Sequence, residues 1–162
     1  MALSASSVWE VRTTGSDTNG GGFVTGASGT DYTQQNAAQY SLTNGVTNGT
    51  TTIATISAAA VMIGNIAYVQ GGTGSVVAGW YQITGASAGV SITVDRSTGL
   101  SAGTGVTINI GGALASPGQS GALLVAGNLI WVKSGTYPIT SASTNISGGC
   151  MNVGVGPVKI EG

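Results

Sequence analysis

Apolar and polar residues alternate over short stretches in the middle of this chain. The alternation is strict at residues 91–95, where it places Ile92 and Val94 on one face. A period of two residues is typical of a β-strand with one buried face. Because glycine-rich segments separate the runs, residues 50–112 are predicted to form a small antiparallel barrel or sandwich. The strands expected in it lie at residues 66–69, 80–84, 90–95 and 106–110.

The segments on either side contain one further strand each. Residues 8–13 form the first, ahead of a glycine cluster at 20–22, and residues 129–132 form the second. A tight turn at positions 134–135 is expected to lead from the second strand into an extended run at residues 136–140. Both flanks are therefore predicted to add β-structure to the central strands.

Short helices and tight turns complete the expected elements. The first helix has Thr30 or Asp31 as its N-cap, and the second has Ser57. A third is weakened by Gly121, which costs about 1 kcal/mol relative to alanine. The helices are predicted at residues 31–40, 57–63 and 119–126, and Asn-Gly pairs predict tight turns at positions 44–45 and 48–49. The expected fold class is mainly all-β with one to three short helices.

The two flanking strands lie within longer motifs. Residues 8–20 are a strand that leads into the turn Gly-Ser-Asp-Thr-Asn-Gly, and residues 127–137 read Gly-Asn-Leu-Ile-Trp-Val-Lys-Ser-Gly-Thr-Tyr. Together they resemble the opening of a right-handed parallel β-helix of the pectate-lyase type, a family in which these two strands pair. The hairpin at residues 79–96 resembles one that is inserted into the β-helix entrance of phage virion proteins.

The resemblance implies a discontinuous organisation. Residues 1–49 and 113–162 are expected to form the β-helix entrance, and residues 50–112 the inserted β-domain. A helix is expected to cover the open end of the solenoid, because exposed edges and an open apolar core promote aggregation. Residues 146–162 are expected to add one further rung. Since at least three repeats are needed for a stable stack, either the native polypeptide continues or neighbouring subunits complete the core.

Composition adds an expectation of self-association. Charged residues make up 6% of the 162 residues, against roughly 25% in typical globular proteins. The net charge of -1 gives little repulsion between copies. The four basic residues are spread along the chain, so nucleic acid is not an expected partner. No apolar run approaches the ~20 residues that cross a bilayer, the N-terminus lacks the basic region of a secretory signal, and the single cysteine, Cys150, is expected to be buried.

Few residues are available for catalysis. The chain has no histidine, which removes the commonest general base and metal ligand. The segment from Asp17 to Gly20 is similar to the first half of a calcium loop, but the remaining ligands are missing and a turn is the favoured interpretation. Glycoside hydrolysis needs two carboxylates ~5–10 Å apart, and the five in this chain are scattered: Glu10, Asp17, Asp31, Asp95 and Glu161. No catalytic residue, metal or cofactor is expected.

Aromatic side chains are the remaining candidates for recognition. Trp80 alternates away from Tyr81 and Ile83, so one of these two faces is expected to be exposed or at an interface. Amphipathic rings are enriched at strand and subunit interfaces, which is the favoured role, and stacking on a glycan is the alternative. The candidate residues are Trp80, Tyr81, Trp131 and Tyr137.

Together these features favour a non-catalytic structural protein of a phage virion, made in the host cytoplasm. Its expected place is a capsid decoration, head fibre or tail fibre. The chain is expected to self-associate, with a homotrimer favoured because fibres of this family are commonly trimeric, and to contact other virion proteins. Two alternatives stay open. One is a carbohydrate-binding adhesin that uses Trp80 or Tyr81 for host glycans, and the other is a truncated polysaccharide depolymerase.

Overall fold

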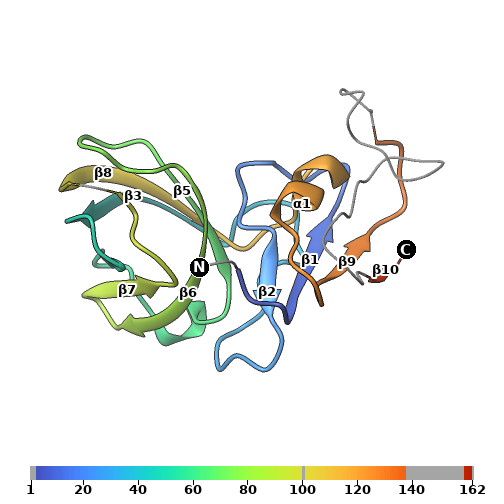
Figure 1. The fold of residues 1–162 in the computed structure, drawn as a ribbon, viewed down its shortest axis with the longest axis horizontal. Helices are drawn as coiled ribbons and strands as arrows, with labels where there is room; N and C mark the ends of the chain where they lie inside the picture. Colours follow the sequence, from blue (N-terminus) through green and yellow to red (C-terminus); the bar gives the residue numbers. More distant parts are fainter. Residues whose placement is uncertain (1–2, 100, 138–158, 162) are drawn as a thin grey trace.

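The described part of the chain forms a closed β-barrel beside a small mixed sheet, with one α-helix against the sheet (Figure 1). The computed structural model describes residues 3–99, 101–137 and 159–161. The expected mainly β fold with a small antiparallel β-domain is confirmed, and the β-domain is a barrel and not a sandwich.

Six antiparallel strands form the barrel, in the spatial order β3-β4-β7-β6-β5-β8 with β8 paired back to β3. Closure leaves none of these strands with an unpaired edge. Residues 40–47, which belong to the range 1–49, thus form a barrel strand. The strands are β3 (Tyr40–Thr47), β4 (Thr52–Ala54), β5 (Ile66–Gln70), β6 (Gly79–Ser87), β7 (Ser91–Val94) and β8 (Gly103–Ile110).

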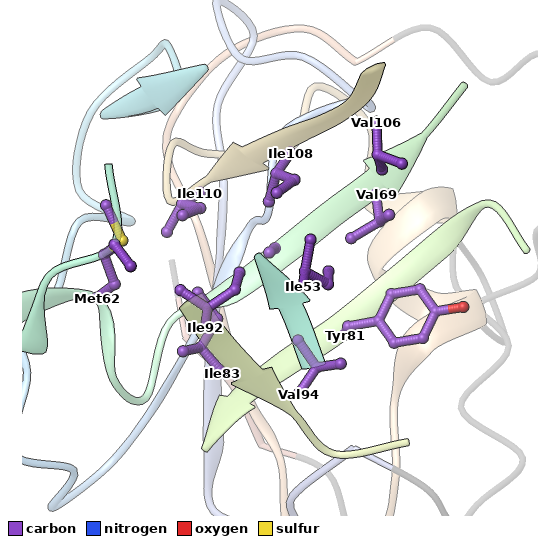
Figure 2. Close-up of a cluster of buried hydrophobic side chains, with 12 residues drawn as sticks. Ile53, Met62, Val69, Tyr81, Ile83, Ile92, Val94, Val106, Ile108 and Ile110 are labelled. Atoms are coloured by element: carbon purple, nitrogen blue, oxygen red, sulfur yellow. The ribbon is translucent and has the colours of Figure 1, made fainter. Parts of the chain in front are cut away.

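Side chains fill the inside of the barrel (Figure 2). Alternate residues of each strand point inward. Met62, from the 3₁₀ turn η1 (Ala60–Met62), packs into the same apolar cluster. A barrel this narrow is a packed core and not a channel. Its largest fully buried residues are Ile53, Met62, Ile83, Ile92, Ile108, Ile110 and Tyr81.

The helix predicted at residues 31–40 is wrong. The segment runs through bends and then enters β3. The Asp31 carboxylate accepts the backbone N–H of Thr33 at 2.8 Å and its hydroxyl at 2.6 Å, which closes a local turn instead of a helix. The carbonyl oxygens of Tyr32 and Gln35 accept from the residues that follow β8, so they are not available for helical bonds.

The turn predicted at Asn44-Gly45 is also wrong, because both residues lie inside β3. The register with β8 shifts on either side of Gly45, which marks a β-bulge. A Cβ atom at Gly45 would lie 2.9 Å from the carbonyl oxygen of Val106, so glycine here allows close packing of the two strands. The second pair supplies a bend, with Gly49 at a φ of 80°.

Two of the three predicted helices exist in shortened form. The α-helix α1 (Pro117–Leu123) begins two residues earlier than the predicted 119–126, with Ser116 as its N-cap and Pro117 in its first turn. The backbone N–H of Gln119 donates to the Ser116 hydroxyl at 3.2 Å. In the segment 57–63 only η1 is helical, and no side chain caps it.

The mixed sheet has the order β10-β9-β1-β2. The strands β1 (Ser7–Val11) and β9 (Leu129–Val132) pair in parallel, as expected, with Trp9 opposite Ile130. On one side β10 (Lys159–Glu161) adds a second parallel pairing, and on the other β2 (Gly22–Val24) is antiparallel. The expected run at 136–140 forms no strand at 136–137, and the rest of it, Cys150 and most of the rung at 146–162 lie outside the described residues.

A second apolar core joins the sheet to the barrel. Trp9, Val11 and Ile130 of the sheet pack with Leu114 and Leu124 of the segment around α1. Ile66 of β5 points out of the barrel into the same cluster and is fully buried there. The barrel wall therefore forms one side of the core of the sheet.

Candidate functional site

Charged residues gather on the parallel strands. The chain has four basic and five acidic residues, and five of these nine belong to or directly follow β1, β9 and β10. The only charged residues of the barrel sequence, from residue 40 to 110, are Asp95 and Arg96. Their side chains form an ion pair at 2.8 Å. The charged residues of the sheet are Glu10, Arg12, Lys133, Lys159 and Glu161.

Glu10 is the centre of this group. It is fully buried, and its Oε1 atom accepts from Arg12 Nε at 2.9 Å and lies 3.6 Å from Lys133 Nζ. Its Oε2 atom is buried without a hydrogen-bond partner in the described part of the protein. Two cations against one carboxylate suit a structural ion pair and not a catalytic pair of carboxylates.

Two of the predicted recognition residues, Trp131 and Tyr137, border this ion pair. Trp131 lies opposite Glu10 in the register, and Lys133 Nζ is 5.7 Å from the centre of its ring. The Tyr137 hydroxyl donates to the carbonyl oxygen of Lys133 at 2.7 Å and lies 3.3 Å from that of Val11. Burial, followed by the negative charge of Glu10, raises the pKa of Tyr137 above its usual value. Trp131 is therefore part of β9, and Tyr137 packs against the apolar core of the same sheet.

One edge of the sheet is sealed, and the other, which we call the free edge, pairs with none of the described residues. On the β2 side, the Val24 backbone N–H donates to the carbonyl oxygen of Gly64 at 2.8 Å, and Phe23 bridges to Asn65. The barrel loop thus covers that edge. On the other side β10 is the outermost strand, and none of the described residues pairs with its outer edge. Unpaired strand edges are ready templates for another strand.

The register indicates which backbone groups of β10 face outward. Lys133 donates its backbone N–H to the carbonyl oxygen of Val11 at 2.9 Å. Backbone groups alternate in direction along a strand, so those of residues an even number of positions from Lys133 also face β1. The backbone groups of Ile130, three positions away, therefore face β10. Ile130 lies opposite Ile160, and in a parallel ladder it pairs with the residues on either side of Ile160. The N–H and C=O groups of Ile160 therefore point to the free edge.

Of the predicted pair in the barrel, Trp80 faces outward. Its indole Nε1 donates to the carbonyl oxygen of Asn19 at 2.9 Å, which links the barrel to the loop after β1. Its ring centre lies 4.5 Å from that of Tyr68 on the neighbouring strand. Both side chains are partly exposed. Trp80 thus lies on the outer face of β6, the face available to solvent or to an interface.

The prediction that Tyr81 is an interface or glycan-stacking residue is wrong. Only 1% of Tyr81 is exposed, because it points into the barrel (Figure 2). Its hydroxyl donates to the carbonyl oxygen of Val77 at 2.7 Å, and the Arg96 guanidinium carbon lies 4.2 Å from its ring centre. Burial raises the pKa of Tyr81 above its usual value.

The carboxylates outside the sheet have structural partners. Asp17 Oδ1 accepts the backbone N–H groups of Ala115 and Ser116, both at 2.9 Å, and Oδ2 accepts the Ser116 hydroxyl at 2.8 Å. Asp17 thereby anchors the start of α1 and is not arranged as a calcium ligand. Among the residues that the structure describes, no three His, Cys, Asp or Glu side chains are placed to hold a metal ion, and no helix is long and apolar enough to span a membrane.

Buried asparagines hold the parts together, and sequence patterns did not single them out. Asn128 Oδ1 accepts the Trp9 indole N–H at 3.0 Å and its Nδ2 donates to the carbonyl oxygen of Ser4. Asn19 Nδ2 donates to the carbonyl oxygens of Asn36 and Ala113, each at 2.8 Å. Their partners are far away in the sequence, so no local signal marks them. Tyr68 was missed although the alternation of residues 66–70 places it on the same side as Gln70.

Comparison with known proteins gives no relative from which a function can be transferred. No protein-family model, curated protein or solved structure matches this chain.

Proposed function

We propose that the chain is a non-catalytic structural subunit of a phage virion, which self-associates and docks onto other virion proteins through its parallel sheet. The observation that carries the proposal is the outer edge of β10, which pairs with none of the described residues, in a sheet whose opposite edge is sealed by the barrel. Parallel sheets are normally covered by further structure. A strand from a second copy would complete the ladder by backbone bonds alone.

The distribution of charge supports association between identical copies. The barrel carries no net charge, since Asp95 and Arg96 pair with each other. Two copies therefore meet with little electrostatic repulsion. A homotrimer is the proposed state, and a capsid decoration, head fibre or tail fibre is the proposed place. The virion context comes from the sequence resemblance of residues 8–20 and 127–137 to phage β-helical proteins.

The test is the mass of the chain in solution, measured by light scattering over a range of concentrations. We expect a trimer. Ile160→Pro removes the N–H that points to the free edge and leaves the bonds between β9 and β10 in place, so it should give a monomer. Ile160→Ala is the matched control, because it shortens the same side chain and keeps the N–H.

Three outcomes would contradict parts of the proposal. A monomer at every concentration would contradict self-association. A trimer that persists in Ile160→Pro would contradict docking at the edge of β10. Release of shortened oligosaccharides from a polysaccharide by the purified chain would contradict the non-catalytic role.

A further inference from the structure

A row of side chains crosses the outer face of four neighbouring barrel strands. The register places Trp80 of β6 opposite Tyr68 of β5, Tyr68 opposite Asn109 of β8, and Asn109 opposite Ser41 of β3. All four are partly or fully exposed, and they alternate with the inward residues that fill the barrel (Figure 2). We call Trp80, Tyr68, Asn109 and Ser41 the aromatic–amide row.

Hydrogen bonds hold the row in one conformation. The Trp80 indole N–H donates to the carbonyl oxygen of Asn19, and Asn109 Nδ2 donates to that of Thr18, each at 2.9 Å. Ser41 Oγ donates to Asn109 Oδ1 at 2.8 Å. The loop that contains residues 18 and 19 thus fixes the row on both sides of Tyr68. Side chains that are already fixed lose little conformational entropy when a ligand binds.

Several polar groups beside the rings are free to bind a ligand. Within the described part of the chain, neither the Tyr68 hydroxyl nor the side chains of Gln70 and Thr107 form a hydrogen bond. Gln70 is the next outward residue of β5, and the register places it opposite Thr107. Both are partly exposed. The partly exposed Tyr68 and Trp80 rings, of which Trp80 also packs against the apolar core of the sheet, therefore lie beside hydroxyl and amide groups that can both donate and accept.

We propose that the aromatic–amide row binds a neutral oligosaccharide, a role beyond the assembly proposed above. A sugar ring presents an apolar C–H face that packs on an aromatic ring, and hydroxyl groups at its rim that need donors and acceptors. The only charged side chains of the barrel neutralise each other, so nothing in the row selects an acidic sugar. Because the barrel interior is filled, the ligand lies across the strands and not inside them.

Single-stranded nucleic acid is the other ligand that stacks on exposed rings. It also needs a groove of basic side chains along its backbone. The barrel has one basic residue, Arg96, which is paired with Asp95 and donates to the backbone carbonyl oxygen of Trp80. The charge of this face thus favours a sugar over a polynucleotide.

The experiment is a titration of the ¹⁵N-labelled full chain, followed by the indole N–H signal of Trp80, which Trp80→Phe identifies. The probes are tetrasaccharides of β-1,4-linked glucose, α-1,4-linked glucose and β-1,4-linked N-acetylglucosamine. Tetragalacturonate and an oligothymidylate serve as charged comparators. We expect at least one neutral tetrasaccharide to shift the signal, and neither charged probe to do so.

Variants locate the binding. Tyr68→Ala should weaken it by about tenfold or more. Gln70→Ala keeps both rings and should weaken binding by about threefold. If Tyr68→Ala does not fold, Gln70→Ala alone tests whether the ligand binds at the row. Thr52→Ala should bind normally, because Thr52 is exposed on β4, on the opposite side of the barrel from β5.

The proposal is overturned by any of three results. These are no shift with any neutral tetrasaccharide, a response to the charged probes alone, or neutral binding that survives both Tyr68→Ala and Gln70→Ala. None of these results depends on the oligomeric state, so they do not bear on assembly through β10.

Discussion

The barrel and the mixed sheet treat their strand edges in opposite ways. Six antiparallel strands close the barrel, so each strand has a partner on both sides. The sheet is sealed by the barrel at β2, and at β10 its outer edge pairs with no residue that the structure describes. Closure makes the barrel complete within one chain, whereas the sheet gains backbone bonds only from a further strand. The strands that are complete within one chain are therefore separate from the strand edge that the proposed assembly would use.

Charge follows the same division. The barrel holds one ion pair, Asp95 with Arg96, and its interior is mainly apolar. The buried polar groups in it include the Tyr81 hydroxyl and the hydrogen-bonded hydroxyls of Thr47 and Thr98. The sheet holds the Glu10 cluster, in which a fully buried carboxylate faces two cations. A buried ion pair is costly to desolvate and is weak evidence for stability. Apolar packing therefore stabilises the barrel, whereas the sheet also depends on a polar arrangement that is sensitive to substitution.

The largest effect is expected from cavities in the two cores. Ile108→Ala in the barrel and Ile130→Ala in the sheet should each lower the free energy of unfolding by about 2–5 kcal/mol, since both residues are fully buried. Denaturant unfolding, followed by circular dichroism, measures the loss. Because Ile66 links the two cores, we expect one transition in each variant. Two separate transitions in Ile130→Ala would show that the barrel folds independently of the sheet.

Neutralising the buried carboxylate tests the polar arrangement of the sheet. Glu10→Gln keeps the shape but removes the charge that pairs with Arg12 and Lys133. Both cations can still reach water, so we expect a loss of about 1.5–3 kcal/mol, the range for hydrogen bonds to charged groups. The control is Asp31→Asn, at an exposed carboxylate on a loop. Equal losses in the two variants would contradict a special role for burial at Glu10.

The contact between the two regions can be tested at a glycine. In Gly20→Ala the new Cβ atom would lie 1.8 Å from the carbonyl oxygen of Ile66, so the loop after β1 has to move away from the barrel. Overpacking of this kind costs about 1–3 kcal/mol. Gly85→Ala is the matched control, because its Cβ atom would lie 3.6 Å from Thr93 at ordinary contact distance. Thermal unfolding of the two variants should separate them clearly.

The alternation of apolar and polar residues predicted most barrel strands. It failed where contacts between distant segments determine the local structure. The runs at 80–84, 90–95 and 106–110 became β6, β7 and β8 with small changes at their ends. The strand β3 was missed because Asn44-Gly45 has the sequence of a turn, yet pairing with β8 absorbs it as a bulge. At this position the pairing that closes the barrel outweighs the local preference for a turn.

The candidate surfaces were predicted only in part. Alternation separates Trp80 from Tyr81 correctly, but it does not tell which face points into the barrel. Tyr81 is inside because β6 pairs with β5 and β7 in a closed ring, which the sequence of β6 alone does not contain. The row that joins Trp80 to Asn109 depends on registers between four strands. Such registers are set by the assembled barrel and not by any local motif.

High pH should lower the stability of both regions, by less than the substitutions above. Burial raises the pKa of Tyr81 in the barrel and, together with Glu10, that of Tyr137 in the sheet. The unfolded chain ionises its tyrosines near pH 10, while the folded chain keeps these two neutral. The stability that this gives is complete below pH 10 and is lost as the pH rises towards the folded values. Tyr137→Phe should reduce the alkaline loss in pH-dependent unfolding, and an unchanged pH profile would contradict the assignment.

The smallest effect, in the opposite direction, is expected at a turn of the barrel. Val90 donates its N–H to Ser87 at 2.9 Å, which places Ala88 at the second position of a tight turn and Gly89 at the third, with a φ of 69°. Proline suits the second position of such a turn. Ala88→Pro should therefore raise the free energy of unfolding by about 0.4–1 kcal/mol, because it restricts the unfolded chain. Since this turn joins β6 and β7 of the closed barrel, whereas β10 belongs to the other sheet, the oligomeric mass should not change. A shift in mass would show that the barrel also contributes to assembly.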